Sequence, residues 1–407
     1  MPRLPAPLRP LFPYLQPAYV QLNRLASPFT VGLSRMNGGH VPTAVVQTLE
    51  EAASSTGGRC VTARPAETIA RPPLIGFPEG LASFEPATDT RIMRVAVAEL
   101  PRGRVLGPSR ALITGHNELV WELSHYFGTS NPKEHPVFGH PFPGEPTQVE
   151  GRLGLLASRG DRNYYHFLID VLPRLGVLEQ AAEIAPPTRW YVPASTPVQR
   201  EFLDLIGIAA EHRIDSDAVP HVRAECLVVP GLPSVVKEKN PPWVVDFLRS
   251  RLMKDARPPQ VDQRRPVYVT RTAGANNRGV RNQPAVLRHL ERRGFEIIDP
   301  STLTGAQQIE SFSPASVIVS AHGAALANLV FASPGSAVVE LFPAGGMLPD
   351  YWRLASSAGL TYRYLSSWNR SSRPVQRSKL IVSDIEVDIP ALDYLLDELG
   401  DELGLAA

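Results

Sequence analysis

The chain has 407 residues, 43% of them hydrophobic, and its formal net charge is +1. This length accommodates two or three domains with cores of their own, and the balanced charge speaks against nonspecific binding to nucleic acid. Cys60 and Cys226 lie far apart and form no metal or redox motif, so we expect free thiols in a reducing compartment. Prolines interrupt every apolar run near the N-terminus, which argues against a secretory signal and for a cytoplasmic protein.

The first third of the chain offers few regular patterns. Residues 1–90 are rich in Pro, Gly, Ser and Ala, and we predict an irregular extension there, with one short helix at 41–54. From residue 91, short strand-like runs follow one another, separated by Gly, Pro and Asn, which are typical turn residues. These runs predict a β-meander, with strands at 91–97, 103–106, 111–114 and 118–122.

The remainder alternates between apolar runs of strand length and amphipathic stretches of helix length. The first alternation predicts strands at 151–158, 190–192 and 225–229, and helices at 164–182, 197–206 and 241–254. Pro173 is expected to kink or break the first of these helices. A polar, proline-containing linker at 255–265 precedes the second alternation. It predicts strands at 266–270, 295–298, 316–320, 337–342 and 362–365, and helices at 283–293, 305–312, 325–331, 350–358 and 389–399.

Strands alternating with helices of about ten residues are typical of doubly wound parallel sheets. The predicted fold class is therefore α/β, with two Rossmann-like lobes and a small β-rich N-terminal region. We expect three parts, at 1–90, 91–255 and 256–407. Ligands bind such sheets at the carboxyl ends of the strands, so a cleft between the two lobes is the expected site.

One long uncharged run dominates the second alternation. Residues 311–339 contain no Asp, Glu, Lys or Arg, a length that would suit a membrane span. Pro334, Gly335 and the polar His322 and Asn328 argue instead for strand, turn, short helix and strand. The turn is built of small residues and leads into a helix N-terminus, where unpaired N–H groups and partial positive charge suit a phosphate.

Asn163, His166 and Asp170 form the first candidate site. His166 and Asp170 are four residues apart, so they share one face of a helix. Either an imidazole or a carboxylate can take a proton from a hydroxyl group. The alternative is a pair that only braces the helix.

Basic residues at the end of the 266–270 strand form the second candidate site. Arg271 follows the strand directly, and its guanidinium is well shaped to bind a diphosphate through two hydrogen bonds. Arg278 lies in the polar loop beyond, where it could neutralise phosphate charge. The alternatives are a salt bridge for Arg271 and an ordinary solvated loop for Arg278.

The third candidate site is the turn within the uncharged run. Gly323 and Ala324 let a ligand approach the backbone closely, and His322 could donate a hydrogen bond to a phosphate or sugar hydroxyl. Asn328 lies one helical turn further on. Glu340, at the end of the next strand, could accept hydrogen bonds from sugar hydroxyls at the same rim, or it could simply face water. Tight packing around a satisfied histidine is the alternative for the turn.

Familiar signatures are missing from the sequence. It contains no G-x-G-x-x-G, Walker A, H-E-x-x-H or G-x-S-x-G motif, which weakens dehydrogenase, NTPase, zinc-protease and α/β-hydrolase interpretations. Asp215 and Asp217 match a loose D-x-D metal pattern, but an Asx turn explains them better. We therefore expect no metal site.

Three sequence blocks, in this order, resemble glycosyltransferase family 61, whose bacterial members include capsular-polysaccharide biosynthesis proteins. They are N-Y-Y-H-F-L-I-D-V-L-P-R-L at 163–175, Y-V-T-R at 268–271, and H-G-A-A-L-A-N-L-V-F-A-S-P-G at 322–335, followed by V-V-E-L at 338–341. The resemblance covers roughly 91–370. It implies a two-lobed glycosyltransferase of the B type, a nucleotide-sugar donor and an inverting mechanism without an essential metal or other cofactor.

The resemblance also implies roles for particular residues. Arg271 and the turn at 322–324 would hold the donor diphosphate, Asn328 would support that turn, and His166 and Asp170 would face the acceptor. With the residues considered above, the donor-binding candidates are Arg271, Arg278, His322, Gly323, Ala324, Asn328 and Glu340, and Asn163 is an acceptor-side candidate. The sequence departs from the family at Asn282-Gln283-Pro284, where Asn-Glu is usual, and at Ala325-Leu326-Ala327-Asn328, where Gly-Leu-Thr-Asn is common.

The resulting hypothesis is an inverting hexosyl- or pentosyltransferase that moves a sugar from a nucleotide sugar to a saccharide or glycolipid. Capsular, exopolysaccharide or lipopolysaccharide synthesis is the expected setting, with peripheral association at the inner face of the membrane left open. We favour Asp170 slightly over His166 as general base. One alternative is a non-catalytic nucleotide-sugar-binding subunit of polysaccharide assembly, and another is a metal-dependent transferase using Asp215 and Asp217. A Rossmann oxidoreductase is a more distant third.

Overall fold

The computed structural model describes most of the chain. The described residues are 11–37, 39–77, 89–126, 129–140, 143–233, 239–254, 259–260, 263–271, 279–344, 347–367 and 383–404. Apart from the first 13 residues, the chain divides into two compact units. The N-terminal unit comprises Tyr14–Glu67 and Arg91–Glu238, and the C-terminal unit comprises Thr68–Thr90 and Lys239–Ala407.

This division differs from the expected one, because residues 1–90 are not a separate extension. Their described part forms helices α1 and α2 and strands β1 to β4, and strand β5 begins at Asp89. Strand β3 (Glu67–Ala70) pairs with β5 (Asp89–Ile92). The chain leaves the N-terminal unit within β3 and returns to it within β5. The strands in this region are short and pair with partners far along the chain, so local sequence patterns do not reveal them.

The N-terminal unit contains a ten-stranded sheet. Its strands are β1 (Ala44–Val46), β2 (Cys60–Arg64), β6 (Val95–Pro101), β7 (Arg104–Leu106), β8 (Ala111–Ile113), β9 (Glu118–Val120), β10 (Thr147–Leu155), β11 (Arg189–Val192), β12 (Arg213–Asp215) and β13 (His221–Pro230). Its helices are α1 (Phe12–Asn37), α2 (Leu49–Thr56), α3 (Tyr164–His166), α4 (Arg174–Glu179) and α5 (Pro197–Leu205), with a π-helical turn at Phe167–Val171. Short 3-10 helices lie at Trp121–Leu123, Pro132–Glu134, Pro136–Gly139 and Ala210–His212.

This sheet is mixed, which corrects the expectation of a parallel, Rossmann-like first lobe. Strand β13 pairs in parallel with β10 along one edge, and β10, β11 and β12 continue in parallel. Along its other edge, β13 pairs antiparallel with β7 and then with β6, which lie end to end. Strands β7, β8 and β9 form part of the expected meander. The predicted first strand at 91–97 does not belong to it, because β5 and β6 occupy that region and β6 pairs with β2 and β13. The antiparallel half arises because β6 and the meander come before β10 in the chain and attach to β13, the same long strand with which β10 pairs.

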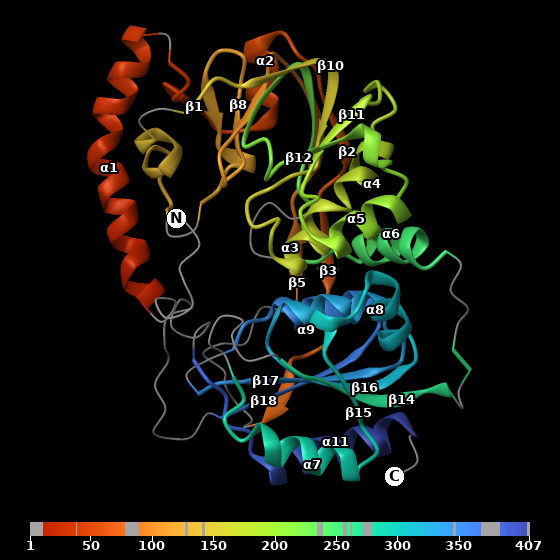
Figure 1. The fold of residues 1–407 in the computed structure, drawn as a ribbon. Helices are drawn as coiled ribbons and strands as arrows, with labels where there is room; N and C mark the ends of the chain where they lie inside the picture. Colours follow the sequence, from red (N-terminus) through yellow and green to blue (C-terminus); the bar gives the residue numbers. More distant parts are fainter. Residues whose placement is uncertain are drawn as a thin grey trace. The chain divides into compact units, whose positions relative to one another are not determined.

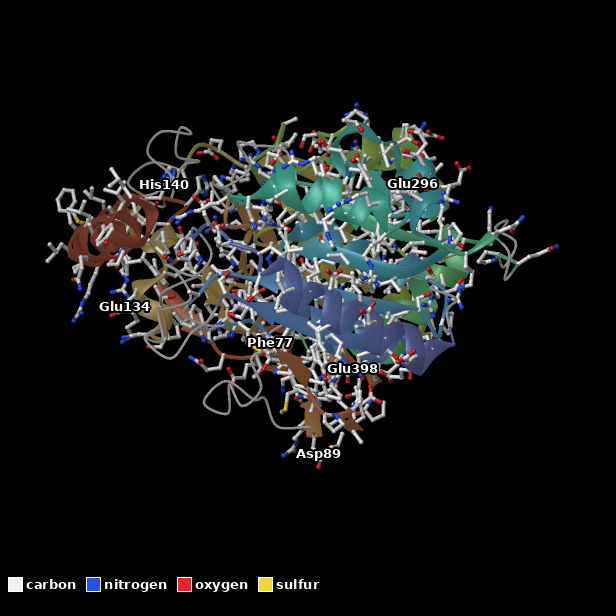
Figure 2. All side chains as sticks on the ribbon, turned by 90° about the horizontal axis from the view of Figure 1, so that it is seen from below. Phe77, Asp89, Glu134, His140, Glu296 and Glu398 are labelled. Carbon is white, nitrogen blue, oxygen red and sulfur yellow. The ribbon has the colours of Figure 1, made fainter. Side chains whose placement is uncertain are left out.

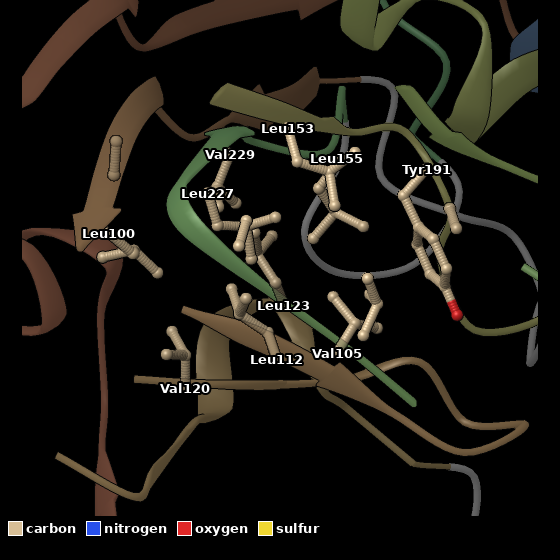
Figure 3. Packing of buried hydrophobic residues seen from close by; sticks show 14 of the residues in the cluster. Leu100, Val105, Leu112, Val120, Leu123, Leu153, Leu155, Tyr191, Leu227 and Val229 are labelled. Carbon is tan, nitrogen blue, oxygen red and sulfur yellow. The ribbon is translucent and has the colours of Figure 1, made fainter. Parts of the chain in front are cut away.

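The core of the N-terminal unit consists of aliphatic side chains from both halves of this sheet. Figure 3 shows Leu100, Val105 and Leu112 on the antiparallel side packed with Leu153 on the parallel side and with Leu227 on the shared strand β13. All five side chains are fully excluded from water. This shared core joins the two halves of the sheet into one compact body.

The C-terminal unit contains a six-stranded parallel sheet. Its strands are β4 (Ile75–Phe77), β14 (Arg265–Val269), β15 (Glu296–Ile298), β16 (Ala315–Ala321), β17 (Ala337–Phe342) and β18 (Thr361–Ser366). Its helices are α6 (Pro242–Leu252), α7 (Gln283–Arg292), α8 (Gly305–Phe312), α9 (Asp350–Ala358) and α11 (Ile389–Leu403), with 3-10 helices at Pro300–Thr302 and Ala324–Phe331.

The strand order in this sheet is β15-β14-β16-β17-β18-β4. From β14 to β18, this is the 2-1-3-4-5 order of a doubly wound sheet, with β4 added at the far edge. Figure 1 shows α7 and α11 on one face and α8 and α9 on the other. The sequence order of strands reverses between β14 and β16, which are neighbours. This reversal is the topological switch point, where ligands bind in sheets of this kind.

The uncharged run forms the centre of this sheet, as predicted. It consists of β16, the 3-10 helix at Ala324–Phe331, and β17, and every residue of both strands is buried. Helices cover both faces of the sheet, which explains why these strands are apolar throughout. None of the helices in the described parts of the chain is both long and apolar enough to cross a membrane.

Candidate functional site

Two of the predicted site residues meet at the switch point of the C-terminal unit. Arg271 lies just beyond the end of β14, and His322 directly follows β16. The two strands pair in parallel, with Val269 opposite Ser320, so both residues emerge at the same edge of the sheet. The guanidinium of Arg271 donates a hydrogen bond from Nη1 to the carbonyl oxygen of His322, over 3.0 Å.

Gly323 allows this close approach of the Arg271 guanidinium to the main chain. A Cβ atom at Gly323 would lie 2.7 Å from Arg271 Nη1, which is too close for any other residue without a shift. The backbone of Gly323 is extended, with φ near 178°, so a larger residue would disturb the Arg271 contact rather than strain the backbone. Burial lowers the pKa of the Arg271 guanidinium, and the nearby Tyr351 partly opposes that effect.

His322 is held from behind by a buried carboxylate. Its Nδ1 lies 2.5 Å from Glu340 Oε1, and the hydroxyl of Tyr362 donates to Glu340 Oε2 over 2.6 Å. The His322 ring also stacks on Phe342 and meets Tyr351 edge-on, each with ring centres 5.2 Å apart. Since an ionised carboxylate only accepts hydrogen bonds, this arrangement places a proton on His322 Nδ1.

The position of Glu340 therefore differs from both predictions, which placed it either at the rim of the site or facing water. Its side chain is 0% exposed, so it neither faces water nor lines an open rim where it could accept from sugar hydroxyls. Burial raises the pKa of the Tyr362 hydroxyl well above its ordinary value, and the charge of Glu340 raises it further. Tyr362 thus remains a donor, and the carboxylate serves to orient His322.

Asn328 supports the 3-10 helix that follows the turn. Its Nδ2 donates to Oε1 of Gln308 on α8 over 2.8 Å, and both side chains are buried. Ala324 is the first residue of the 3-10 helix and is half-buried. Arg278 lies outside the described residues. Asn282, at one of the departures from the family pattern, exchanges hydrogen bonds of 2.8 and 3.0 Å with the main chain of Val387, which gives it a structural role.

The second group of predicted residues lies in the N-terminal unit. Asn163 caps helix α3, because its side chain accepts from the main-chain N–H of Tyr165 over 2.9 Å. His166 Nδ1 and Asp170 Oδ2 are 2.7 Å apart, and the two side chains are similarly accessible, at 17% and 16%. Gly160 makes room for the imidazole, since a Cβ atom there would lie 2.9 Å from the ring.

The helix that carries this pair is not regular. It runs as α3, a π-helical turn and then α4 after Pro173, so the expected break at Pro173 is confirmed. Such π turns occur frequently at functional sites, because they displace side chains from regular helical positions. Asp170 lies within the π turn.

Arg174 is the residue of this region that sequence reasoning missed. Its guanidinium is buried and donates to three carbonyl oxygens, those of Leu156, Ala157 and Pro230, at 2.6 to 3.0 Å. Burial lowers its pKa to about 9, although the negative charge of Asp170 opposes the shift. The spacing of four residues between Asp170 and Arg174 is the signal that could have revealed it.

The D-x-D pattern is an Asx turn, as expected. The side chain of Asp215 accepts from the main-chain N–H of Asp217 over 3.0 Å. Asp217 also forms ion pairs with Arg110 and Arg162, at 2.5 and 2.8 Å. Among the residues that the structure describes, no group of three or more His, Cys, Asp or Glu side chains is arranged to hold a metal ion.

The structure thus brings together two groups of predicted residues, one in each unit. Arg271, His322, Gly323 and Glu340 meet in the C-terminal unit, and the site residues of the N-terminal unit are Asn163, His166 and Asp170. The two cysteines are free and half-buried, and burial raises the pKa of each thiol.

Comparison with known proteins confirms the resemblance drawn from the three sequence blocks. The family model described as Glycosyltransferase 61 matches residues 164–339. The matched segment contains His166, Asp170, Arg271 and His322, and it ends one residue before Glu340. A search of curated proteins finds no match. Residues 164–339 of this chain are therefore similar to glycosyltransferase family 61.

Proposed function

We propose that this protein is a glycosyltransferase that uses a nucleotide-sugar donor and a saccharide or glycolipid acceptor, and that it inverts the configuration of the transferred sugar. The observation that carries the proposal is the contact of the Arg271 guanidinium with the main chain at His322 and Gly323, at the switch point of a doubly wound sheet. We further propose a Rossmann-like donor lobe and a role in the synthesis of a capsule or another polysaccharide.

The chemistry of the Arg271 group suits a diphosphate. A guanidinium offers several N–H donors in a fork that matches phosphate oxygens, and a glycine beside it allows those oxygens to approach the backbone. Burial penalises the cationic form of Arg271, and the negative charge of a bound diphosphate would relieve that penalty. Glu340 holds the His322 ring in place beside the same turn. These groups, rather than a divalent metal, would stabilise the departing nucleoside diphosphate.

The transfer step would be a single displacement. The oxygen of an acceptor hydroxyl attacks the anomeric carbon, the bond from that carbon to the diphosphate oxygen breaks, and the hydroxyl proton passes to a general base. We assign that role to Asp170, whose carboxylate lies 2.7 Å from His166 Nδ1. A carboxylate held in this position by the imidazole can accept the proton of a hydroxyl group placed beside it.

Donor binding is tested by thermal denaturation with uridine, guanosine, cytidine and thymidine diphosphates. A nucleotide at a hundred times its Kd stabilises the folded form by about 2.7 kcal/mol. Arg271→Met should weaken binding by about tenfold to a hundredfold, since a hydrogen bond to a charged group is worth about 1.5–3 kcal/mol. Arg292→Met, which alters an exposed arginine on α7, should bind like the wild type. A protein stabilised by none of these nucleotides would refute the proposed donor.

The base is tested with Asp170→Asn and whichever nucleotide sugar corresponds to the bound nucleotide. We expect transfer and slow donor hydrolysis to fall by about 10²–10⁴-fold, which is the contribution of a positioned base, with unchanged nucleotide stabilisation. Full activity in this variant would remove Asp170 from the role and leave His166 as candidate. Nucleotide binding without transfer or hydrolysis by the wild type would instead favour a non-catalytic binding subunit.

A further inference from the structure

Helix α1 presents an unusual distribution of side chains. Its large apolar residues are strongly exposed, with Leu22 at 66%, Leu25 at 77%, Phe29 at 70% and Met36 at 82% of their maximum. These residues recur at intervals of three, four and seven, so they share one face of the helix. A contiguous apolar face of this kind on a protein surface marks an interaction site.

The opposite face of α1, which packs on the protein, is the more polar one. Thr30 is buried and its hydroxyl donates to the carbonyl oxygen of Phe138, and buried Ser34 donates to that of Val41 over 2.9 Å. Asn23 packs closely against Gly139. Figure 2 shows α1 beside the labelled Glu134 and His140, with its other side chains extending outward. Val20 is also buried on this side and Val31 packs against a core cluster. Amphipathic helices normally bury their large apolar residues, whereas α1 leaves most of its own exposed.

The charged residues of α1 itself have a single sign. The first 49 residues include Arg3, Arg9, Arg24 and Arg35 but no Lys, Asp or Glu. Arg24 approaches Glu134 at 3.5 Å, yet its side chain remains 61% exposed. Arg35, also exposed, donates to the carbonyl oxygen of Thr43 over 3.0 Å. Exposed arginines therefore accompany the apolar face.

We propose that α1 docks the protein on an anionic lipid bilayer, lying flat in its interface. Leu22, Leu25 and Phe29 would insert among the acyl chains, and Arg24 and Arg35 would contact the lipid head groups. Helices with an exposed apolar face and basic residues bind membranes in this way, gaining from both apolar burial and attraction to negative lipids. The proposal does not depend on the donor, the acceptor or the base proposed above.

A second copy of the chain is a weaker candidate for this surface. A helical pair normally gains orientation from ion pairs that flank its apolar seam, and α1 contains no carboxylate to form one. Its arginines would instead repel those of a second copy. Pro17 and Pro28 are exposed, and these helix breakers would interrupt a continuous seam.

Vesicle flotation with the full chain tests the proposal. We expect the wild type to float with vesicles of phosphatidylcholine and phosphatidylglycerol, much less with phosphatidylcholine alone, and less at high salt. Leu25→Ser with Phe29→Ser should weaken binding at least tenfold, because two large apolar side chains no longer insert. Tyr394→Ser, which removes a large side chain that is 64% exposed on α11, should leave flotation unchanged.

A second variant separates the electrostatic contribution. Arg24→Gln with Arg35→Gln should weaken binding to the anionic vesicles by about fivefold for each arginine, with little effect on binding to neutral ones. Thermal denaturation checks that each variant is folded, which we expect because the altered side chains are exposed. No flotation of the folded wild type would overturn the proposal. A dimer that becomes a monomer in Leu25→Ser with Phe29→Ser, without vesicle binding, would assign the surface to a second copy.

Discussion

The isosteric substitution Glu340→Gln tests whether the buried carboxylate orients His322. The carboxylate accepts two hydrogen bonds, from His322 at 2.5 Å and from Tyr362 at 2.6 Å, and is fully excluded from water. Glutamine retains one acceptor oxygen, so its amide group must face one of the two donors. One hydrogen bond is therefore lost, and the other becomes a neutral one.

The expected cost follows from these two contacts. Each hydrogen bond to a charged group contributes about 1.5–3 kcal/mol, and a neutral one about 1 kcal/mol. The gross loss is thus about 2–5 kcal/mol by that scale, and relief of the burial cost of the carboxylate offsets part of it. We expect a net destabilisation of about 2 kcal/mol, which lowers the Tm by about 4–8 °C in a unit of this size.

Scanning calorimetry measures this change, with Glu310→Gln on an exposed position of α8 as the matched control. Tyr362→Phe should lose less stability in the Glu340→Gln background than in the wild type, because the two residues share one hydrogen bond. Glu340→Gln should also weaken the nucleoside diphosphate stabilisation, since His322 loses its fixed orientation. A variant as stable as the wild type would refute an ionised Glu340 held by two donors.

Two further predictions concern stability. Burial lowers the pKa of His135 to about 3 from its ordinary 6.5, so the unfolded chain binds the proton first and stability falls as the pH drops from 6.5 towards 3. The asparagine of His135→Asn keeps an acceptor for the main-chain N–H of Val137. By that linkage the variant should lose about 2 kcal/mol less stability than the wild type between pH 7 and 5, as measured by urea denaturation. An equal loss of stability in both proteins would contradict the prediction. At Gly76, an added Cβ would lie 2.3 Å from Tyr364. Gly76→Ala should therefore detach β4 at a cost of about 1–3 kcal/mol and speed hydrogen exchange in β18, and unaltered exchange would disprove the clash.

Elements with strong local signals could be predicted from the sequence. Thr196 and Gln199 form a reciprocal capping box at the start of α5, and Thr304 and Gln307 do the same for α8. These caps, together with apolar periodicity, predict helix positions within a few residues. Arg271 and His322 could be placed at one sheet edge for a similar reason, since the carboxyl ends of parallel strands meet there.

Features that depend on distant partners could not be predicted in this way. Glu340 looks like an exposed strand end in sequence, and only its contacts with His322 and Tyr362 show that it is buried. The acceptors of Arg174 are main-chain carbonyls on other segments, which carry no sequence signature. Helix α1 contains two prolines and an apolar face that does not enter the core, so its sequence resembled an irregular segment.

The pairing of β4 with β18 determines when the sheet of the C-terminal unit can be completed during protein synthesis. Ile75 lies opposite Arg363, so the ribosome must synthesise residues 78–362 before the sheet of the C-terminal unit can close. At about 5–20 residues per second, this delay is on the order of tens of seconds. A fragment beginning at Lys239 would lack β4 and expose the open edge of β18, which can pair with other chains. Covering this edge in such a fragment therefore calls for β4, supplied in the same chain or added as a separate peptide.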